Sequence, residues 1–366
     1  MVQFLRMLAA IALTAFCWGV YGPVLHFGRD GMQSPLRPFV CVGIAYFLIA
    51  VLIPLVLLTR GGEKGSWTRT GVLWSLLAGT AGALGALGVI LALNFGGKPI
   101  YVMPLVFGGA PVINTLLNAF MTKSFNQLKA PFLAGLILVV MGAVTVLIFK
   151  PVPHGHATPA AVASAVPSAT VDADDAGEEL AESPTHSVAP ATARPERFLE
   201  VLLSVALAMF SWGAYGPVLH KGQTAMAGSR LRPLICIGIA YFLIAVLVPL
   251  ALLGPLGDTG NWNSSGVLWS LGGGSLGALG ALGTILAFSS GGKPFTVMPV
   301  VFGCAPVINT FTTLAFAHTP TGAVSPFFLA GLLVVAAGAA TVLAFGPRGH
   351  APGKPHSPAD APPAPA

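Results

Sequence analysis

Two asparagines stand out because each lies inside a long apolar stretch. Asn114 and Asn309 both occur in the sequence Ala-Pro-Val-Ile-Asn-Thr. An amide that lacks a hydrogen-bonding partner in a hydrocarbon medium costs several kcal/mol of free energy. Each amide must therefore face either a polar group on a neighbouring helix or a polar cavity that holds a solute. The sequence leaves both interpretations open.

Two prolines precede each of these asparagines, Pro104 and Pro111 in the first stretch and Pro299 and Pro306 in the second. A proline inside a helix removes a backbone hydrogen bond and clashes with the preceding turn. We therefore expect both helices to be kinked or broken. Freed backbone groups at membrane depth need protein or a water-filled cavity around them. The prolines thus predict either a solute site near the membrane midplane or packing kinks in a dense bundle.

Aromatic side chains form a second candidate group. Trp18 and Tyr21 lie in the first apolar stretch, and Trp212 and Tyr215 occupy the same positions in a later one. Their flat, amphipathic rings are suited to stacking on a solute. The alternative is a belt of aromatic residues at the membrane interface, which is at least as good an explanation for Tyr21.

Cationic groups at the ends of apolar stretches are the third candidate group. His26 and Lys98 should lie at one rim of the membrane, and His220 and Lys293 at the other. Each pair is predicted to line one mouth of a pathway that tolerates anionic or neutral solutes. The alternative is that the lysines extend to the lipid headgroups and the histidines cap helix ends.

Acidic residues are absent from the apolar stretches, apart from Glu200 at the start of one of them. The chain therefore has no midplane carboxylate to carry a proton, no pair of acids for hydrolysis and no cluster of metal ligands. It also lacks the Gly-x-x-x-x-Gly-Lys loop that would bind a nucleotide. We expect neither an enzyme nor a cofactor. The basic residues form no dense run, so no nucleic-acid partner is expected either.

Composition defines the elements that must position these residues. Hydrophobic residues make up 55% of the 366, charged residues only 8%, and the mean hydropathy is +0.81. Apolar stretches of about 20 residues recur, each long enough to cross a bilayer as a helix. The first stretch resembles a signal peptide, but its internal copy indicates that it is retained. The four cysteines lie inside these stretches and imply no disulfide.

An internal repeat organises the chain. Residues 1–150 align with residues 198–347, and the sequence Gly-Ile-Ala-Tyr-Phe-Leu-Ile-Ala-Val-Leu occurs unchanged in both. Each copy holds five predicted spans, which in the first copy cover residues 4–27, 39–58, 72–95, 99–121 and 132–149. Because five is odd, the second copy must enter the membrane from the opposite side. The predicted fold is an all-α membrane protein with about ten transmembrane helices arranged as two inverted five-helix repeats.

Two further segments complete the chain. Residues 151–197 are rich in Ala, Pro, Ser and acid and predict a disordered linker on the outer side, and residues 348–366 form a Pro-rich tail. Lys and Arg residues in the loops divide 12 to 6 between the two sides. The positive-inside rule then predicts that both termini are cytoplasmic and that the protein is a multi-pass protein of the cell inner membrane.

Short motifs occur at matching positions of the two copies. They are Trp18-Gly19, Pro104 and Pro111, with the copies Trp212-Gly213, Pro299 and Pro306. Together with five spans per half and an inverted duplication, they resemble the drug/metabolite transporter (DMT) superfamily, in particular its EamA-like members. The resemblance implies a ten-helix secondary carrier with a central cavity. The Trp-Gly-x-Tyr-Gly-Pro stretch also looks like the opening of the sugar-uptake branch.

The expected function is secondary transport of a small polar or anionic metabolite by alternating access. A sugar-type permease and a non-transporting membrane scaffold are the alternatives. The expected partners are a small-molecule solute and the lipid bilayer. The sequence leaves the oligomeric state open, with a homodimer as one option.

Overall fold

The computed structural model describes residues 1–61, 63–97, 99–149, 197–317 and 325–347. The predicted linker, except Arg197, and the predicted tail lie outside these residues, as does Lys98. The described chain is helical and contains no strand, and ten of its segments are long and apolar enough to cross a membrane. The predicted all-α fold is therefore confirmed, and it contains the ten expected helices that are long and apolar enough to be membrane spans.

The first five spans are made of seven helical segments. They are α1 (Val2–Met32), α2 (Arg37–Tyr46), η1 (Phe47–Leu52), α3 (Ile53–Thr59), α4 (Arg69–Asn94), α5 (Pro99–Thr122) and α6 (Ala130–Ile148). A short 3₁₀ turn, η2 (Phe125–Gln127), precedes α6. The second five spans repeat this order. They are α7 (Phe198–Ala225), α8 (Leu231–Phe242), η4 (Leu243–Leu247), α9 (Val248–Leu252), α10 (Ser264–Ser289), α11 (Pro294–Ala317) and α12 (Pro326–Phe345).

A π-helical turn interrupts the second span of each half. The turns η1 and η4 directly precede α3 and α9, which carry Pro54 and Pro249 in their first turns. Proline has no N–H to donate to the turn before it, so a local change of hydrogen-bonding register accompanies each proline. Both turns fall in the ten-residue sequence that the halves share, which explains why the same irregularity occurs twice.

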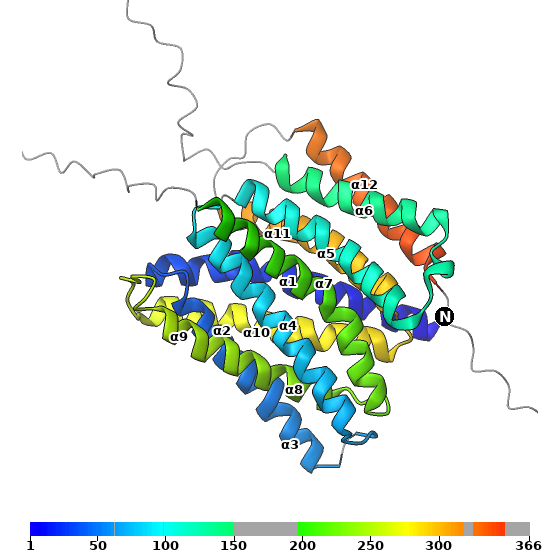
Figure 1. The fold of residues 1–366 in the computed structure, drawn as a ribbon, viewed down its shortest axis with the longest axis horizontal. Coiled ribbons are helices and arrows are strands. Elements are labelled where there is room, and N and C mark those ends of the chain that lie inside the picture. Colours follow the sequence, from blue (N-terminus) through cyan, green and yellow to red (C-terminus); the bar gives the residue numbers. More distant parts are fainter. Residues whose placement is uncertain (62, 98, 150–196, 318–324, 348–366) are drawn as a thin grey trace, which may run out of the picture.

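The two halves pack against each other through matching pairs of helices. In one set α1 packs against α10 and α11 and α2 packs against α10, and in the other α7 packs against α4 and α5 and α8 packs against α4. Figure 1 shows α6 and α12 side by side along one edge of the bundle, next to α5 and α11, with α2, α3, α8 and α9 at the opposite edge. The described core consequently lies between the halves rather than within either one.

Glycines allow these helices to approach closely. In α10, a methyl group added to Gly274 would come within 2.7 Å of the backbone of Val42 in α2, and one added to Gly283 would meet Thr14 of α1 at 2.5 Å. Gly79 and Gly88 of α4 are equally close to the backbones of α8 and α7. These glycines give α4 and α10 a smooth face on which helices of the opposite half pack closely.

Side-chain caps begin α4 and α10 and also join the halves. The Gly71 amide donates to Thr68 Oγ1 (3.0 Å), and the Thr68 hydroxyl itself donates to the Ala225 carbonyl at the end of α7 (2.9 Å). In the other half the Gly266 amide donates to Asn263 Oδ1 (2.7 Å), and Asn263 Nδ2 donates to the Gly31 carbonyl near the end of α1. One polar residue thus satisfies two helix ends at once.

The bundle has two ends, which we name after a carboxylate at each. At the Asp258 end, the Asn261 amide donates to the Met32 carbonyl where α1 ends (2.9 Å). At the Glu63 end, Glu63 contacts the segment that follows α7. Because α7 begins beside the end of α4 and finishes at the Glu63 end, α1 and α7 cross the bundle in opposite directions.

The two ends of the described chain lie near each other. Gln3 at the start of α1 lies beside Gly291, in the loop between α10 and α11. Gly346, just after α12, lies against Thr296 in the first turn of α11. Residues 3 and 346 therefore lie at the same end of the bundle, the Glu63 end.

Candidate functional site

The asparagines predicted from the sequence bind backbone carbonyls of the opposite half. Asn309 Nδ2 of α11 donates to the Gly19 carbonyl of α1 (3.2 Å). In an α-helix this carbonyl would accept from the residue four positions later, which here is Pro23 and has no N–H. The asparagine therefore supplies the donor that the proline lacks.

The same arrangement occurs in the other half. Asn114 Nδ2 of α5 donates to the Gly213 carbonyl of α7 (3.3 Å), which lies four residues before Pro217. Asn114 is fully buried, whereas Asn309 is half-buried. Of the two interpretations left open, hydrogen bonding between helices is confirmed for both amides.

Glycines in the Trp-Gly-x-Tyr-Gly-Pro motif provide the space for this contact. A methyl group added to Gly19 would lie 2.6 Å from the Ile308 side chain, and one added to Gly22 would lie 2.7 Å from Asn309 Nδ2. Gly213 and Gly216 are equally constrained by Ile113 and by the amide of the other asparagine. The glycines thus hold α1 against α11 and α7 against α5.

The tryptophans of the motif bind the glycine-rich helices. Trp18 Nε1 donates to the Gly277 carbonyl (3.3 Å), and its ring lies over Gly280 of α10. Trp212 Nε1 donates to the Gly82 carbonyl of α4 (3.1 Å). Indole N–H groups at membrane depth need such partners, and each ring fits only because a glycine lies beneath it.

Four tyrosines gather where the halves meet. The rings of Tyr46 in α2 and Tyr241 in α8 are stacked, with centroids 3.8 Å apart and planes within 3° of parallel. Tyr46, Tyr241 and Tyr215 belong to one buried core, and Tyr21 packs against it. Tyr21 is half-buried and packs against the core, so an interfacial aromatic belt does not describe its position.

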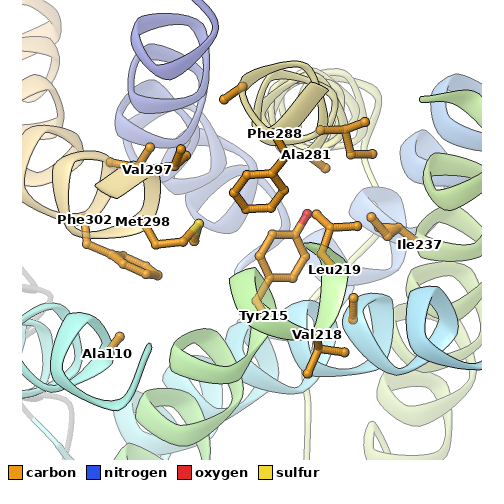
Figure 2. Close-up of a cluster of buried hydrophobic side chains, with 14 of the residues drawn as sticks. Ala110, Tyr215, Val218, Leu219, Ile237, Ala281, Phe288, Val297, Met298 and Phe302 are labelled. Atoms are coloured by element: carbon orange, nitrogen blue, oxygen red, sulfur yellow. The ribbon is translucent and has the colours of Figure 1, made fainter. Parts of the chain in front are cut away.

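Further aromatic contacts connect the tyrosines to both tryptophans. The Trp18 ring is 5.8 Å from Tyr215 and 6.5 Å from Phe302, and the Phe107 ring is 6.2 Å from Phe302 and 5.9 Å from Trp212. Figure 2 shows Tyr215 of α7 directed toward α10, with Phe302 and Met298 of α11 nearby. We call this set of residues the aromatic cluster: Trp18, Tyr21, Tyr46, Phe107, Trp212, Tyr215, Tyr241 and Phe302.

Two buried polar atoms at the aromatic cluster lack a hydrogen-bonding partner among the described residues. They are the Tyr215 hydroxyl, which belongs to the cluster, and Asn114 Oδ1, whose amide lies against Gly213 and Gly216 on either side of Tyr215 in sequence. A buried polar atom without a partner costs about 1–3 kcal/mol, so hydrogen bonds from a polar ligand would recover free energy here. The aromatic cluster therefore combines flat apolar faces with unused hydrogen-bonding capacity.

Tyr46, Tyr241, Phe107 and Phe302 were not predicted from the sequence. The sequence did contain a signal for the two tyrosines, because each is the only strongly polar aromatic group in the ten-residue sequence shared by the halves. Their stacking depends on α2 and α8 meeting face to face, which no pattern within one half reveals.

Of the kink or break predicted at the prolines, the break is wrong. Both α5 and α11 continue as helices of 24 residues through Pro104, Pro111, Pro299 and Pro306, and all four rings are buried. Within α11, Thr310 donates to the Pro306 carbonyl (2.9 Å). The prolines consequently shape the packing of these helices around the aromatic cluster without opening their backbones.

The histidines and Lys293 are not members of the aromatic cluster, and the two histidines have different surroundings. His26 is exposed, with Nε2 3.4 Å from the Asp30 carboxylate. His220 is half-buried and packs edge-on against Phe288 at 5.2 Å, and Lys293 is exposed but close enough to His220 to interact electrostatically. The two histidines were predicted to occupy equivalent positions at the two mouths, but His26 is exposed and His220 is not. Lys98 lies outside the described residues.

Metal-binding groups or cavities among the described residues would indicate a second site. The described residues contain no group of three or more His, Cys, Asp or Glu that would hold a metal ion. A cavity of about 120 Å³ lies at the Asp258 end of the bundle. Its lining is polar at several positions and is formed by Gln33, Pro35, Leu36, Asn94, Leu256, Gly257, Asp258 and Thr259.

Comparison with known proteins supports the fold. No family model and no curated protein matches the chain. Thirteen chains of solved structures match it. One of them, described only as "Crystal structure of protein", has a TM-score of 0.59 and 16% sequence identity, and the match covers 95% of this chain and 99% of that chain. The chain therefore shares its fold with a solved structure over nearly the whole length of both.

Proposed function

We propose that the protein is a secondary carrier that moves a small polar solute across the inner membrane by alternating access. The observation that carries the proposal is the aromatic cluster, which is built from both halves and has two buried polar atoms without partners, the Tyr215 hydroxyl within it and Asn114 Oδ1 beside it. Membership of the drug/metabolite transporter superfamily, on the resemblance of its short motifs, is part of the proposal.

The chemistry of the aromatic cluster favours a neutral solute that carries several hydroxyl or amide groups. Its members supply ring faces, hydroxyls and indoles, and none is charged. Lys293, a predicted attractor of anions, is exposed just before the start of α11. A sugar-type solute fits these groups, because its apolar ring face stacks on aromatic residues and its hydroxyls bond to tyrosines.

Two observations support an inverted arrangement of the halves. Several contacts are reciprocal, since a bond from the first half to the second has a counterpart in the opposite direction, as with Asn114 and Asn309. In addition, α1 and α7 run in opposite directions across the bundle. Such halves can rock about a central site and expose it to one side and then the other.

The test is transport into proteoliposomes that contain the purified protein. Labelled neutral polyols and sugars, amino acids and small carboxylates would be offered separately, with empty liposomes as the control. We expect saturable uptake of a neutral solute, and a loss of at least tenfold in kcat/KM, about 1.4 kcal/mol, on Tyr241→Phe or Tyr215→Phe. Absence of uptake and of exchange for every solute would contradict the carrier proposal, and a preference for carboxylates would contradict the neutral site.

A further inference from the structure

Each end of the bundle has a buried carboxylate that joins one half to the other. Asp258, in the loop between α9 and α10, accepts from Arg37 Nε (2.9 Å) and contacts the Ser34 hydroxyl, both at the start of α2. Only 3% of the Asp258 side chain is exposed. The Arg37 guanidinium also lies over the Trp262 ring at 5.4 Å. We call Ser34, Arg37, Asp258 and Trp262 the Asp258 latch.

The opposite end repeats this arrangement with the halves exchanged. Glu63, in the loop between α3 and α4, accepts from the Ser229 hydroxyl (2.7 Å), and Arg232 Nη1 lies 3.6 Å from it. Glu63 is 4% exposed, and Arg232 lies over the Trp67 ring at 5.8 Å. We call Glu63, Trp67, Ser229 and Arg232 the Glu63 latch.

These latches hold the helices that carry the stacked tyrosines. The Asp258 latch fixes the start of α2, which carries Tyr46, and the Glu63 latch fixes the start of α8, which carries Tyr241. A carboxylate that loses its partners while it remains buried is strongly unfavourable, but one that becomes hydrated as it separates is not. A latch can therefore break only if its end of the bundle opens to water.

We propose that the Asp258 latch and the Glu63 latch are the two gates of the pathway, and that each must break for its end to open. This inference rests on the proposed carrier function. Both latches are formed in the structure, so it corresponds to a state closed at both ends. Alternating access then consists of breaking one latch while the other holds the halves together.

The latches differ in the number of bonds between the halves. Glu63 also accepts from the backbone amides of Arg230 (2.6 Å) and Leu231 (3.1 Å). Pro35 stands at the position equivalent to Arg230 and has no amide to donate to Asp258. The Asp258 latch has fewer bonds to lose, and we expect the resting protein to open more often at the Asp258 end.

The test measures access to the aromatic cluster from each side of the membrane. Cys17, Cys41, Cys236 and Cys304 are replaced by Ala, and Tyr21→Cys serves as the reporter in oriented vesicles treated with a membrane-impermeant maleimide. We expect Glu63→Gln to raise labelling about tenfold from the Glu63 end only, and Asp258→Asn to raise it similarly from the Asp258 end only. Glu200→Gln, which alters an exposed ion pair with Arg197, is the matched control and should change neither rate.

Unchanged labelling in both gate variants, or an equal rise from both sides, would overturn the proposal. Transport is measured separately in the chain with its natural cysteines and Tyr21. Sided labelling without transport of any solute would contradict the carrier function but keep the gates. Transport with unchanged labelling would support the carrier function but contradict the gates.

A second variant covers the case in which an amide substitution prevents folding. Ser34→Cys combined with Asp258→Cys, in the same cysteine-free background without the reporter, replaces the Asp258 latch by a disulfide that can be formed and reduced in one sample. We expect oxidation to stop transport by at least tenfold and dithiothreitol to restore it. Equal transport by the oxidised and reduced forms, with the disulfide verified by mass spectrometry, would overturn the role of this latch.

Discussion

At the scale of single residues, the most informative contact is that between Asn309 and the Gly19 carbonyl. It places a side-chain donor where Pro23 removes a backbone donor. The contact could exist solely for packing, or the amide could also bind the solute through its oxygen. A pair of substitutions separates these roles, because the missing backbone donor can be restored at its source.

We predict that Asn309→Leu lowers the free energy of unfolding by about 1–3 kcal/mol, since it leaves the Gly19 carbonyl without a donor. Adding Pro23→Ala should recover most of this loss by providing a backbone N–H for the same carbonyl. Thermal unfolding of the detergent-solubilised variants measures both effects. If the double variant regains stability but not transport, the amide also contacts solute; if stability does not recover, the proline explanation is wrong.

The latch carboxylates give a pH prediction. Burial raises the pKa of Glu63, but hydrogen bonds from Ser229 and from the Arg230 and Leu231 amides outweigh burial and hold this pKa below its ordinary value of 4.5. A carboxyl with a lowered pKa stabilises the folded state above its unfolded pKa, about 4.3, and this contribution is lost as the pH falls through the folded pKa.

We therefore expect the melting temperature to be insensitive to Glu63 titration between pH 7 and about pH 5 and to fall below about pH 4.3. The fall should be shallower in Glu63→Gln, which has no carboxyl to protonate there. Glu200→Gln, at an exposed pair, should follow the natural protein. Parallel curves for Glu63→Gln and the natural protein would show that Glu63 is not held ionised by its neighbours.

At the scale of helices, the glycines of α10 determine how closely α1 can approach. A methyl group on Gly280 would lie 2.2 Å from Trp18 Nε1, whereas one on Gly272 would lie 3.8 Å from its nearest neighbour, Val24. The indole cannot move away without weakening its bond to the Gly277 carbonyl. Gly280, which is tightly packed, and Gly272, which has space beside it, thus form a matched pair for testing the packing of α10.

We predict that Gly280→Ala destabilises the protein by about 1–3 kcal/mol through overpacking. Gly272→Ala should be neutral or stabilising by up to about 1 kcal/mol, because alanine is the better helix former. Chemical or thermal unfolding in detergent measures the difference. Equal effects of the two substitutions would indicate that the α1 and α10 interface is looser than described.

Much of the helical organisation follows from local sequence, but the site does so only in part. Hydropathy and the internal repeat predict ten spans, and the helical spacing of Gly82 and its neighbours predicts a packing face. The aromatic cluster and the latches require contacts between residues more than 150 positions apart, such as Glu63 with Ser229. Two sequence signals for the latches occur in both copies. One is an acid four residues before a tryptophan, and the other is a serine three residues before an arginine, as in Ser34 with Arg37 and Ser229 with Arg232.

The expected break at Pro104 and its equivalents failed for a physical reason. A proline removes one hydrogen bond from a helix, but in a packed bundle the neighbouring helices still hold the chain in helical form. We also expected polar groups near the prolines of α5 and α11, where they would satisfy backbone groups that lack a hydrogen bond. The structure instead shows such donors beside Pro23 and Pro217 of α1 and α7.

At the scale of the whole molecule, both ends of the described chain lie at the Glu63 end. With the 12 to 6 division of basic residues, we predict that this end faces the cytoplasm. Thr259→Cys, an exposed position at the Asp258 end, should react with an impermeant thiol reagent added to intact cells. Ser66→Cys, exposed at the Glu63 end, should react only after the membrane is permeabilised. The opposite pattern would reverse the orientation.

Each half carries the donor that a proline of the other half requires, and each carries the carboxylate of a latch whose arginine belongs to the other half. The two halves therefore cannot change independently over generations. A substitution that removes Pro217 relaxes the requirement for Asn114 more than 100 positions away, while Pro23 still requires Asn309. Although the sequence arose by copying one unit, the two copies are now complementary. A functional protein requires both copies together.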